Sequence, residues 1–137
     1  MIRTALISAA AASLAAAALA SAQTGPSTLH LVAQERGGFF VKHPKPGSRF
    51  GFVSSVTGDD HGTSRAVCTD LGKGLLCTLQ LNLAKGTITA QGVLPQRTHD
   101  TPVAITGGTG AYDGARGTAL TTDTSASKTS IDISLLG

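Results

Sequence analysis

Cys68 and Cys77 have the clearest chemical potential in this chain of 137 residues, which contains no other cysteine. A thiol nucleophile would need a free cysteine with a base nearby. A two-residue turn at Gly72-Lys73, however, would place the two cysteines opposite each other, and glycine at its first position is typical of a type II′ hairpin. A closely spaced antiparallel pair suits a disulfide. We therefore predict that Cys68 and Cys77 form a structural disulfide.

The other polar residues form no motif typical of a catalytic or metal centre. No histidine has a partner in an H-x-H or H-E-x-x-H pattern, and no C-x-x-C pair accompanies one. No serine lies in a G-x-S-x-G elbow, and Asp59-Asp60-His61-Gly62 is typical of a turn. We therefore expect no metal and no cofactor. The four histidines are His30, His43, His61 and His99.

The glycine-rich segment over residues 106–114 has, at first sight, the spacing of a dinucleotide-binding turn. Such a turn holds a pyrophosphate against backbone N–H groups at the start of a helix. Asp113, however, stands where the pattern needs a third glycine, and the residues after it alternate like a strand. Only 23 residues follow Gly114 in the 137-residue chain, which leaves no room for further βαβ units. We therefore expect no nucleotide site.

Apolar and polar residues alternate with period two through most of the chain, which predicts strands and no long helix. So many short strands in one small domain favour an all-β fold, an eight-stranded antiparallel up-and-down barrel, because closure removes exposed edges. A β-sandwich is the alternative. An eight-stranded barrel has room inside for side chains or one small ligand. The predicted strands cover residues 28–34, 49–56, 63–70, 75–83, 87–94, 101–106, 116–122 and 128–136.

The first 22 residues differ in composition from the rest of the chain. A single positive charge precedes an Ala/Leu/Ile run over residues 5–20, and small residues at 20–22 form a signal-peptidase site. The run is too rich in alanine, and too interrupted by serine, for a membrane anchor. We therefore expect a signal peptide over residues 1–22 that is cleaved before Gln23.

The rest of the chain, residues 23–137, is expected to be one secreted domain in an oxidising compartment, with no membrane association after cleavage. The chain has 11 basic and 8 acidic residues, and the basic residues are scattered singly. No basic patch typical of nucleic-acid binding is visible, so no nucleic-acid partner is expected.

The run over residues 104–117, Ala-Ile-Thr-Gly-Gly-Thr-Gly-Ala-Tyr-Asp-Gly-Ala-Arg-Gly, resembles the signature of the allene oxide cyclase barrel and of the related dirigent proteins. Weaker matches at residues 47–50, 66–68 and 86–92 extend the resemblance over most of the mature chain. It implies an eight-stranded antiparallel barrel with an apolar cavity and no cofactor. Cyclases close an epoxide-derived cation, and dirigent proteins bias the coupling of phenoxy radicals. Relatives often assemble as trimers, so the resemblance also suggests a homotrimer.

The resemblance makes two charged residues candidates for a catalytic role. Plant cyclases hold the developing cation with a glutamate on the first strand. The corresponding strand here, residues 29–33, has no acid, and Glu35 lies just beyond it, out of register. Arg116 matches the arginine of the dirigent Ala-Arg-Gly motif. By alternation it shares an interior face with Leu120, or it is a charge at the barrel rim paired with Asp113; both interpretations stay open.

The ligand cavity is expected to be lined by apolar residues on the inner face. Alternation shows which residues share a face but not which face is inside, so the choice rests on burial preference. The expected lining residues are Leu29, Leu31, Phe50, Phe52, Ala90, Ile105 and Leu120. Such a lining favours a small hydrophobic molecule.

The sequence therefore predicts a secreted barrel that binds a small apolar molecule and steers its cyclisation or coupling, as a cofactor-independent isomerase would. A non-catalytic binding or carrier protein on the same barrel is the first alternative. The missing acid on the first strand favours this alternative, because cation chemistry usually needs an electrostatic stabiliser. A structural module with a solid interior is the second alternative.

Overall fold

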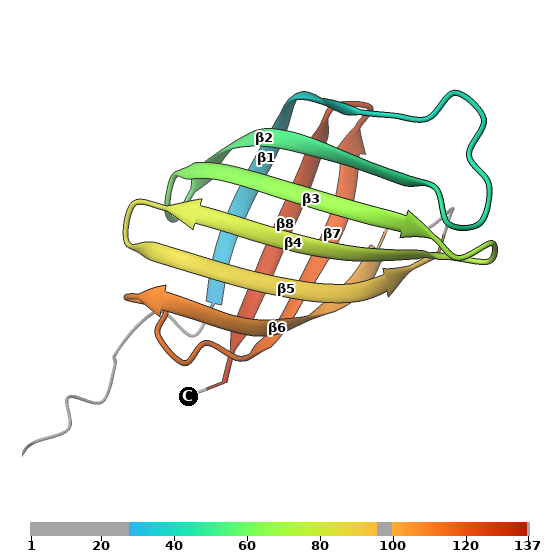
Figure 1. Cartoon of the computed structure of the whole chain (residues 1–137). Helices are drawn as coiled ribbons and strands as arrows, with labels where there is room; N and C mark the ends of the chain where they lie inside the picture. The colour runs from blue at the N-terminus through green and yellow to red at the C-terminus, as the bar shows by residue number, and fades with distance from the viewer. Residues whose placement is uncertain (1–27, 96–99, 137) are drawn as a thin grey trace, which may run out of the picture.

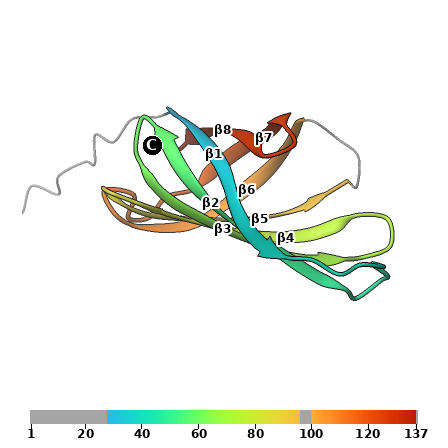
Figure 2. The same ribbon diagram turned by 90° about the horizontal axis from the view of Figure 1, so that it is seen from above.

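The computed structural model describes residues 28–95 and 100–136. Eight antiparallel strands follow one another around one closed barrel, in which β8 pairs with β1 (Figure 1). The strands are β1 Thr28–Phe39, β2 Arg49–Gly58, β3 Gly62–Asp70, β4 Leu75–Leu83, β5 Gly86–Leu94, β6 Asp100–Gly110, β7 Gly117–Ser125 and β8 Lys128–Leu135. Seen from above, β7 and β8 form the wall opposite β3 and β4 (Figure 2). The predicted all-β antiparallel barrel is confirmed, and the β-sandwich alternative is wrong.

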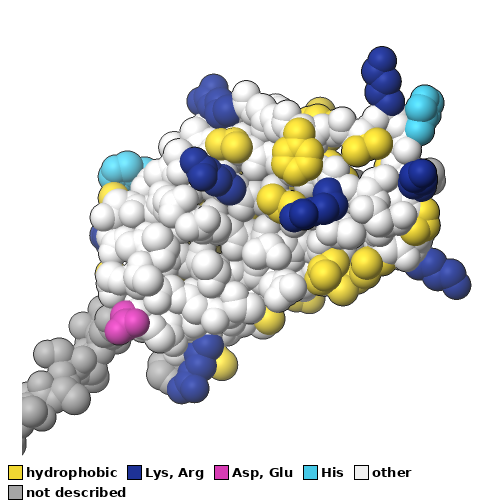
Figure 3. Space-filling model, viewed as in Figure 1, with side chains coloured by type: hydrophobic (Ala, Val, Ile, Leu, Met, Phe, Trp, Pro, Cys, Tyr) yellow, Lys and Arg dark blue, Asp and Glu magenta, His cyan; other side chains and the backbone are white. Residues whose placement is uncertain are grey.

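The predicted signal peptide, residues 1–22, and the predicted cleavage site before Gln23 lie outside the described residues. Within the described ranges, no helix has the length and apolar character needed to cross a membrane. On the face of the molecule shown in Figure 3, Lys and Arg side chains stand apart from one another rather than in one patch.

β1 runs to Phe39, beyond the predicted strand end at Gln34. The extension contains a bulge between Glu35 and Gly37, where the register against β2 shifts. A β-carbon on Gly38 would lie 2.2 Å from the carbonyl oxygen of Gly51, so the close approach of the two backbones depends on glycine. Adjacent glycines such as Gly37-Gly38 are typical of a turn. In the structure both lie within β1, and its pairing with β2 continues past them.

The first part of the glycine-rich signature, as far as Gly110, belongs to strand β6. Gly107–Gly110 in β6 pairs with the beginning of β5, and the turn is confined to residues 111–114. A β-carbon on Gly108 would lie 2.2 Å from the carbonyl oxygen of Tyr112. Glycine at this position therefore lets the following turn fold back against its own strand.

Large apolar side chains fill one half of the barrel, which we call the packed half. It is formed mainly by the beginnings of β1, β5 and β7 and the ends of β4, β6 and β8, which lie together because neighbouring strands are antiparallel. Every residue of the set is at most 9% exposed: Leu29, Leu31, Leu81, Leu83, Ile88, Ile105, Ala119 and Ile133. Burial of this apolar surface is the main term that stabilises the barrel.

Tyr112 closes the outer end of the packed half. The turn after β6 folds its side chain against the core, where the residue is 3% exposed. Its hydroxyl donates a hydrogen bond of 2.7 Å to Oδ2 of Asp60, between β2 and β3. Asp60 is also 3% exposed, and it accepts the backbone N–H groups of His61 at 2.8 Å and Lys85 at 3.3 Å. The predicted turn is present, but Asp60 also joins three segments of the chain.

The three donors decide the charge state of the buried carboxyl. Burial by itself would raise the pKa of Asp60, but the hydrogen bonds from Tyr112, His61 and Lys85 hold that pKa below its ordinary value. Burial and the neighbouring Asp60 carboxylate raise the pKa of Tyr112, so its hydroxyl keeps the proton that it donates. The packed half therefore ends in a buried, ionised and fully hydrogen-bonded acid.

Tyr112→Phe removes one of these hydrogen bonds and keeps the ring. We expect the free energy of unfolding at neutral pH to fall by about 1–3 kcal/mol, because a buried ionised acceptor loses a donor. The folded-state pKa of Asp60 is lowered, so its stabilising contribution is complete above its unfolded pKa of about 3.9 and is lost as pH falls through the folded pKa. The difference between the wild-type protein and the variant should therefore shrink at acidic pH. Urea unfolding followed by circular dichroism at several pH values measures both effects.

Asp113→Asn is the matched control, since Asp113 is an exposed acid in the same turn. Its effect on the free energy of unfolding should stay within about 0.5 kcal/mol. An unchanged stability of Tyr112→Phe, or a difference that grows as the pH falls, would contradict this account of Asp60.

Candidate functional site

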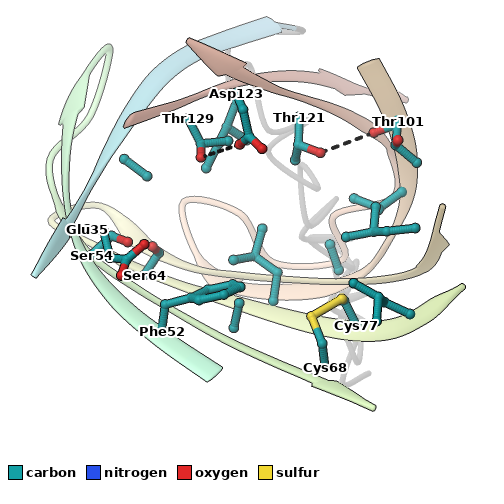
Figure 4. A pocket seen from close by; sticks show the side chains of 18 of the residues that line it. Glu35, Phe52, Ser54, Ser64, Cys68, Cys77, Thr101, Thr121, Asp123 and Thr129 are labelled. Carbon is teal, nitrogen blue, oxygen red and sulfur yellow. Dashed lines mark hydrogen bonds between the residues drawn. A yellow bond between two sulfur atoms is a disulfide. The ribbon is translucent and has the colours of Figure 1, made fainter. Parts of the chain in front are cut away.

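The half of the barrel opposite Tyr112 holds a cavity of about 380 Å³ (Figure 4). All eight strands contribute to its wall, together with the β7–β8 turn. The lining includes the exposed Ser125 at the end of β7 and the exposed turn residues Ala126 and Ser127, so the cavity reaches solvent at this end of the barrel. Its volume lies within the range of about 300–1,000 Å³ that is typical of small-molecule sites.

The cavity exists because the inward side chains at this level are small. Along β1 the inner positions pass from Leu29 and Leu31 to Ala33. The other small inward residues at this level are Ser54, Ser64, Ala66 and Ala90. Because the width of an eight-stranded barrel is fixed, small side chains on several facing strands leave unfilled volume.

Aromatic rings form one side of the cavity. Phe50 and Phe52 point inward from β2, with ring centroids 6.0 Å apart, and the ring of Phe52 projects into the space (Figure 4). Phe40, 62% exposed, packs its ring 6.1 Å from that of Phe52. The rings offer a ligand a planar apolar surface at the wall of the cavity.

The predicted disulfide is confirmed and forms another part of this wall. Cys68 on β3 pairs with Cys77 on β4, their Cα atoms are 4.0 Å apart, and the sulfur atoms are bonded. The turn that sets this register closes with a hydrogen bond of 2.8 Å from the N–H of Leu71 to the carbonyl oxygen of Gly74. Gly72 has φ 89°, as the first position of such a turn requires.

Polar groups lie on two separate sides of the cavity (Figure 4). On one side Glu35, Ser54 and Ser64 occupy one row, since Glu35 pairs with Ser54 and Ser54 pairs with Ser64 on the next strand. On the other side Asp123 accepts a hydrogen bond of 2.9 Å from the hydroxyl of Thr129. The two carboxylates face the cavity from different walls.

Of the predicted lining residues, Phe50, Phe52 and Ala90 line the cavity. Leu29 and Leu31 are on the inner face as predicted, but they lie in the packed half and outside the cavity lining. Ile105 also lies in the packed half and outside the cavity lining, and it is 6% exposed.

The prediction that Leu120 faces inward is wrong, because its side chain is 38% exposed on the outer face. The inner face of β7 carries Ala119, Thr121 and Asp123. Burial preference selects leucine over alanine, but at this level only the small Ala119, 0% exposed, fits beneath the neighbouring leucines and isoleucines.

The interior interpretation of Arg116 is also wrong, because Arg116 alternates in step with Thr118 and Leu120, which are exposed. Arg116 precedes β7, is exposed, and alternates with Gly117 and Ala119 rather than sharing their face. No ion pair joins it to Asp113, although the structure describes both residues. Its backbone carbonyl oxygen accepts the N–H of Leu136 at 2.9 Å.

The interpretation of Glu35 as out of register is also wrong. Because β1 continues past Gln34, Glu35 shares the inner face with Leu29, Leu31 and Ala33, and it lines the cavity half-buried. Its backbone N–H donates to the carbonyl oxygen of Ser127 at 2.8 Å, which fixes the backbone at the entrance.

The polar lining residues Ser54, Ser64, Asp123 and Thr129 were not predicted from the sequence. Alternation along each strand provides a signal for them, because Ser54 follows Phe50 and Phe52 at steps of two. Because these residues are polar, burial preference does not select them for the interior. Within residues 28–95 and 100–136, no three His, Cys, Asp or Glu side chains gather in a way that could hold a metal ion.

Reducing the Cys68–Cys77 bond should lower the free energy of unfolding by about 2–3 kcal/mol, because the bond closes a loop of sequence separation 9. Urea unfolding with and without dithiothreitol measures this change. A Cys68→Ala/Cys77→Ala variant controls for effects of the reductant, since its unfolding curve should not respond to it. Identical urea midpoints for the oxidised and the reduced wild-type protein would contradict a stabilising role of the disulfide.

Comparison with known proteins places the fold but not the activity. No protein-family model matches the chain, and no curated protein matches it. Among solved structures, the chain is similar to pyocyanin demethylase, with a TM-score of 0.69 and 21% sequence identity over 80% of this chain and 99% of that chain. No family match supports the allene oxide cyclase or dirigent resemblance specifically. The chain is thus an eight-stranded antiparallel barrel of the same general fold as that enzyme.

Proposed function

We propose that this protein binds one small, largely apolar molecule in the open half of its barrel. The observation that carries the proposal is the cavity of about 380 Å³ beside a fully packed core. A barrel that served only as a structural module would gain stability by filling this volume with larger side chains, since apolar burial stabilises and cavities cost free energy.

The chemistry of the wall supports this class of ligand. Phenylalanine rings, the disulfide and aliphatic side chains such as Leu79 and Leu94 provide most of the surface, and a few hydroxyl and carboxylate groups interrupt it. This combination of a mainly apolar wall with a few polar groups is typical of sites that orient a small organic molecule.

A catalytic role is the second candidate, and the position of Glu35 favours it. The alternative of a pure carrier rests on the absence of an acid at the first strand, but Glu35 lies on that strand and faces the cavity. A carboxylate there can stabilise positive charge that develops on a bound molecule, as an isomerase or cyclase of the resembling family requires. The similar barrel is named as an enzyme that demethylates pyocyanin, so this fold can support small-molecule catalysis, although a fold alone does not define an activity.

We also infer that the protein acts after export. The composition of residues 1–22 is typical of a signal peptide, and the Cys68–Cys77 disulfide is stable in oxidising compartments. The homotrimer suggested by the resemblance stays a prediction that sedimentation equilibrium can test.

Binding can be measured with the neutral fluorescent probe N-phenyl-1-naphthylamine, whose emission rises in apolar surroundings. We expect saturable binding of one probe per chain. Ala66→Phe places a ring in the cavity from β3 and should weaken binding at least about tenfold, equivalent to about 1.4 kcal/mol. Thermal unfolding confirms that the variant is folded.

Ala104→Phe is the matched control, because Ala104 is exposed on the outer face of β6 and the same substitution there leaves the cavity unchanged. Failure of the folded wild-type protein to bind the probe, or equal loss of binding in the two variants, would count against a ligand site inside the barrel.

A further inference from the structure

The charged groups of the cavity all have the same sign. Glu35 and Asp123 line it, and no described Lys, Arg or His side chain does. Composition does not explain this bias, because the chain has 11 Lys and Arg residues against 8 Asp and Glu residues. The excess of acidic side chains in the cavity therefore results from which residues the strands place on their inner face.

Strand alternation turns the neighbouring basic side chains away from the cavity. Arg49 and Arg65 each adjoin a lining residue in sequence, yet both are exposed. Lys128 is exposed beside the lining residue Thr129. Next to Glu35, the exposed Arg36 donates from Nε to the hydroxyl of Ser55 at 3.0 Å, and Ser55 is not part of the cavity lining.

The two carboxylates act on a bound molecule from different walls. Glu35 stands beside Ser54 at the β1–β2 side, and Asp123 stands beside Thr129 at the β7–β8 side (Figure 4). A cation between them is attracted by both groups, and an anion is repelled by both. Glu35 is half-buried and Asp123 is exposed to solvent, so each contributes the modest energy of a screened charge.

The aromatic part of the wall favours the same sign of charge. Phe50 and Phe52, with ring centroids 6.0 Å apart, both line the cavity, and the ring of Phe52 projects into it (Figure 4). A cation is attracted by the negative face of an aromatic ring, and the apolar body of an organic cation gains from contact with the same ring.

We propose that the ligand is a small organic cation, an aromatic or alicyclic amine or ammonium compound whose apolar body lies against the phenylalanines while its charge faces Glu35 and Asp123. This inference rests on the proposed function, since it names the charge class of the molecule that occupies the cavity.

Three probes with one ring system test the inference: 1-naphthylmethylamine as the cation, 1-naphthalenemethanol as the neutral compound and 1-naphthoate as the anion. Titration calorimetry at neutral pH and low ionic strength gives their dissociation constants. We expect the cation to bind about three- to tenfold more tightly than the neutral compound, and the anion to bind more weakly than both. Added salt should reduce the ratio, because it screens charges that are partly exposed.

The variant Glu35→Gln/Asp123→Asn keeps the shape of both side chains and removes their charge. It should lose most of the preference for the cation over the neutral compound, because only the attraction of the phenylalanine rings for the cation remains. Asp113→Asn, which removes an exposed acid that does not line the cavity, should leave the wild-type ratio unchanged.

The outcomes separate the two claims. If the neutral compound binds and the cation has no advantage, or if the double variant keeps the advantage, the charge inference is overturned and the binding function stands. If none of the three probes binds the folded protein, both claims are overturned.

Discussion

The fixed width of a closed eight-stranded barrel is the constraint on which the rest of this structure depends. Once β8 has paired with β1, the interior cannot contract around small side chains. The size of the inward residue at each level therefore decides whether that level is solid or hollow. Leucine and isoleucine make one half a core, and alanine and serine make the other half a cavity. Stability and binding are thus assigned to different ends of the same strands.

The two ends are also closed by different means. At the packed end, Tyr112 folds over the barrel and donates to the buried Asp60, an arrangement that depends on the absence of a side chain at Gly108. The glycine-rich signature thus has a structural role here, remote from the cavity. In the open half, the Cys68–Cys77 disulfide links neighbouring strands beside the cavity. A covalent bond stabilises the wall and leaves the interior volume free.

The features that the sequence predicted well are those determined locally. The Gly72-Lys73 turn sets the register of β3 and β4, so the cysteine pairing follows from counting residues along one hairpin. The features that it did not predict depend on contacts between distant segments. Leucine is larger and more apolar than its neighbour Ala119, yet Leu120 faces solvent because strands far away in sequence already fill that level. Glu35 faces the cavity because β1 continues past Gln34, where Glu35 pairs with Ser54 on β2 and its backbone N–H donates to the carbonyl oxygen of Ser127.

The central claim, that one half of this barrel is solid and the other half receives a small molecule, is tested most directly by NMR. Amide chemical shifts are followed in a ¹⁵N-labelled sample during titration with N-phenyl-1-naphthylamine. The account predicts large changes for Ser64, Ala66 and Thr129, and unchanged shifts for Leu29 and Ile133 in the packed half. Changes confined to the outer face, or spread equally through both halves, would contradict it.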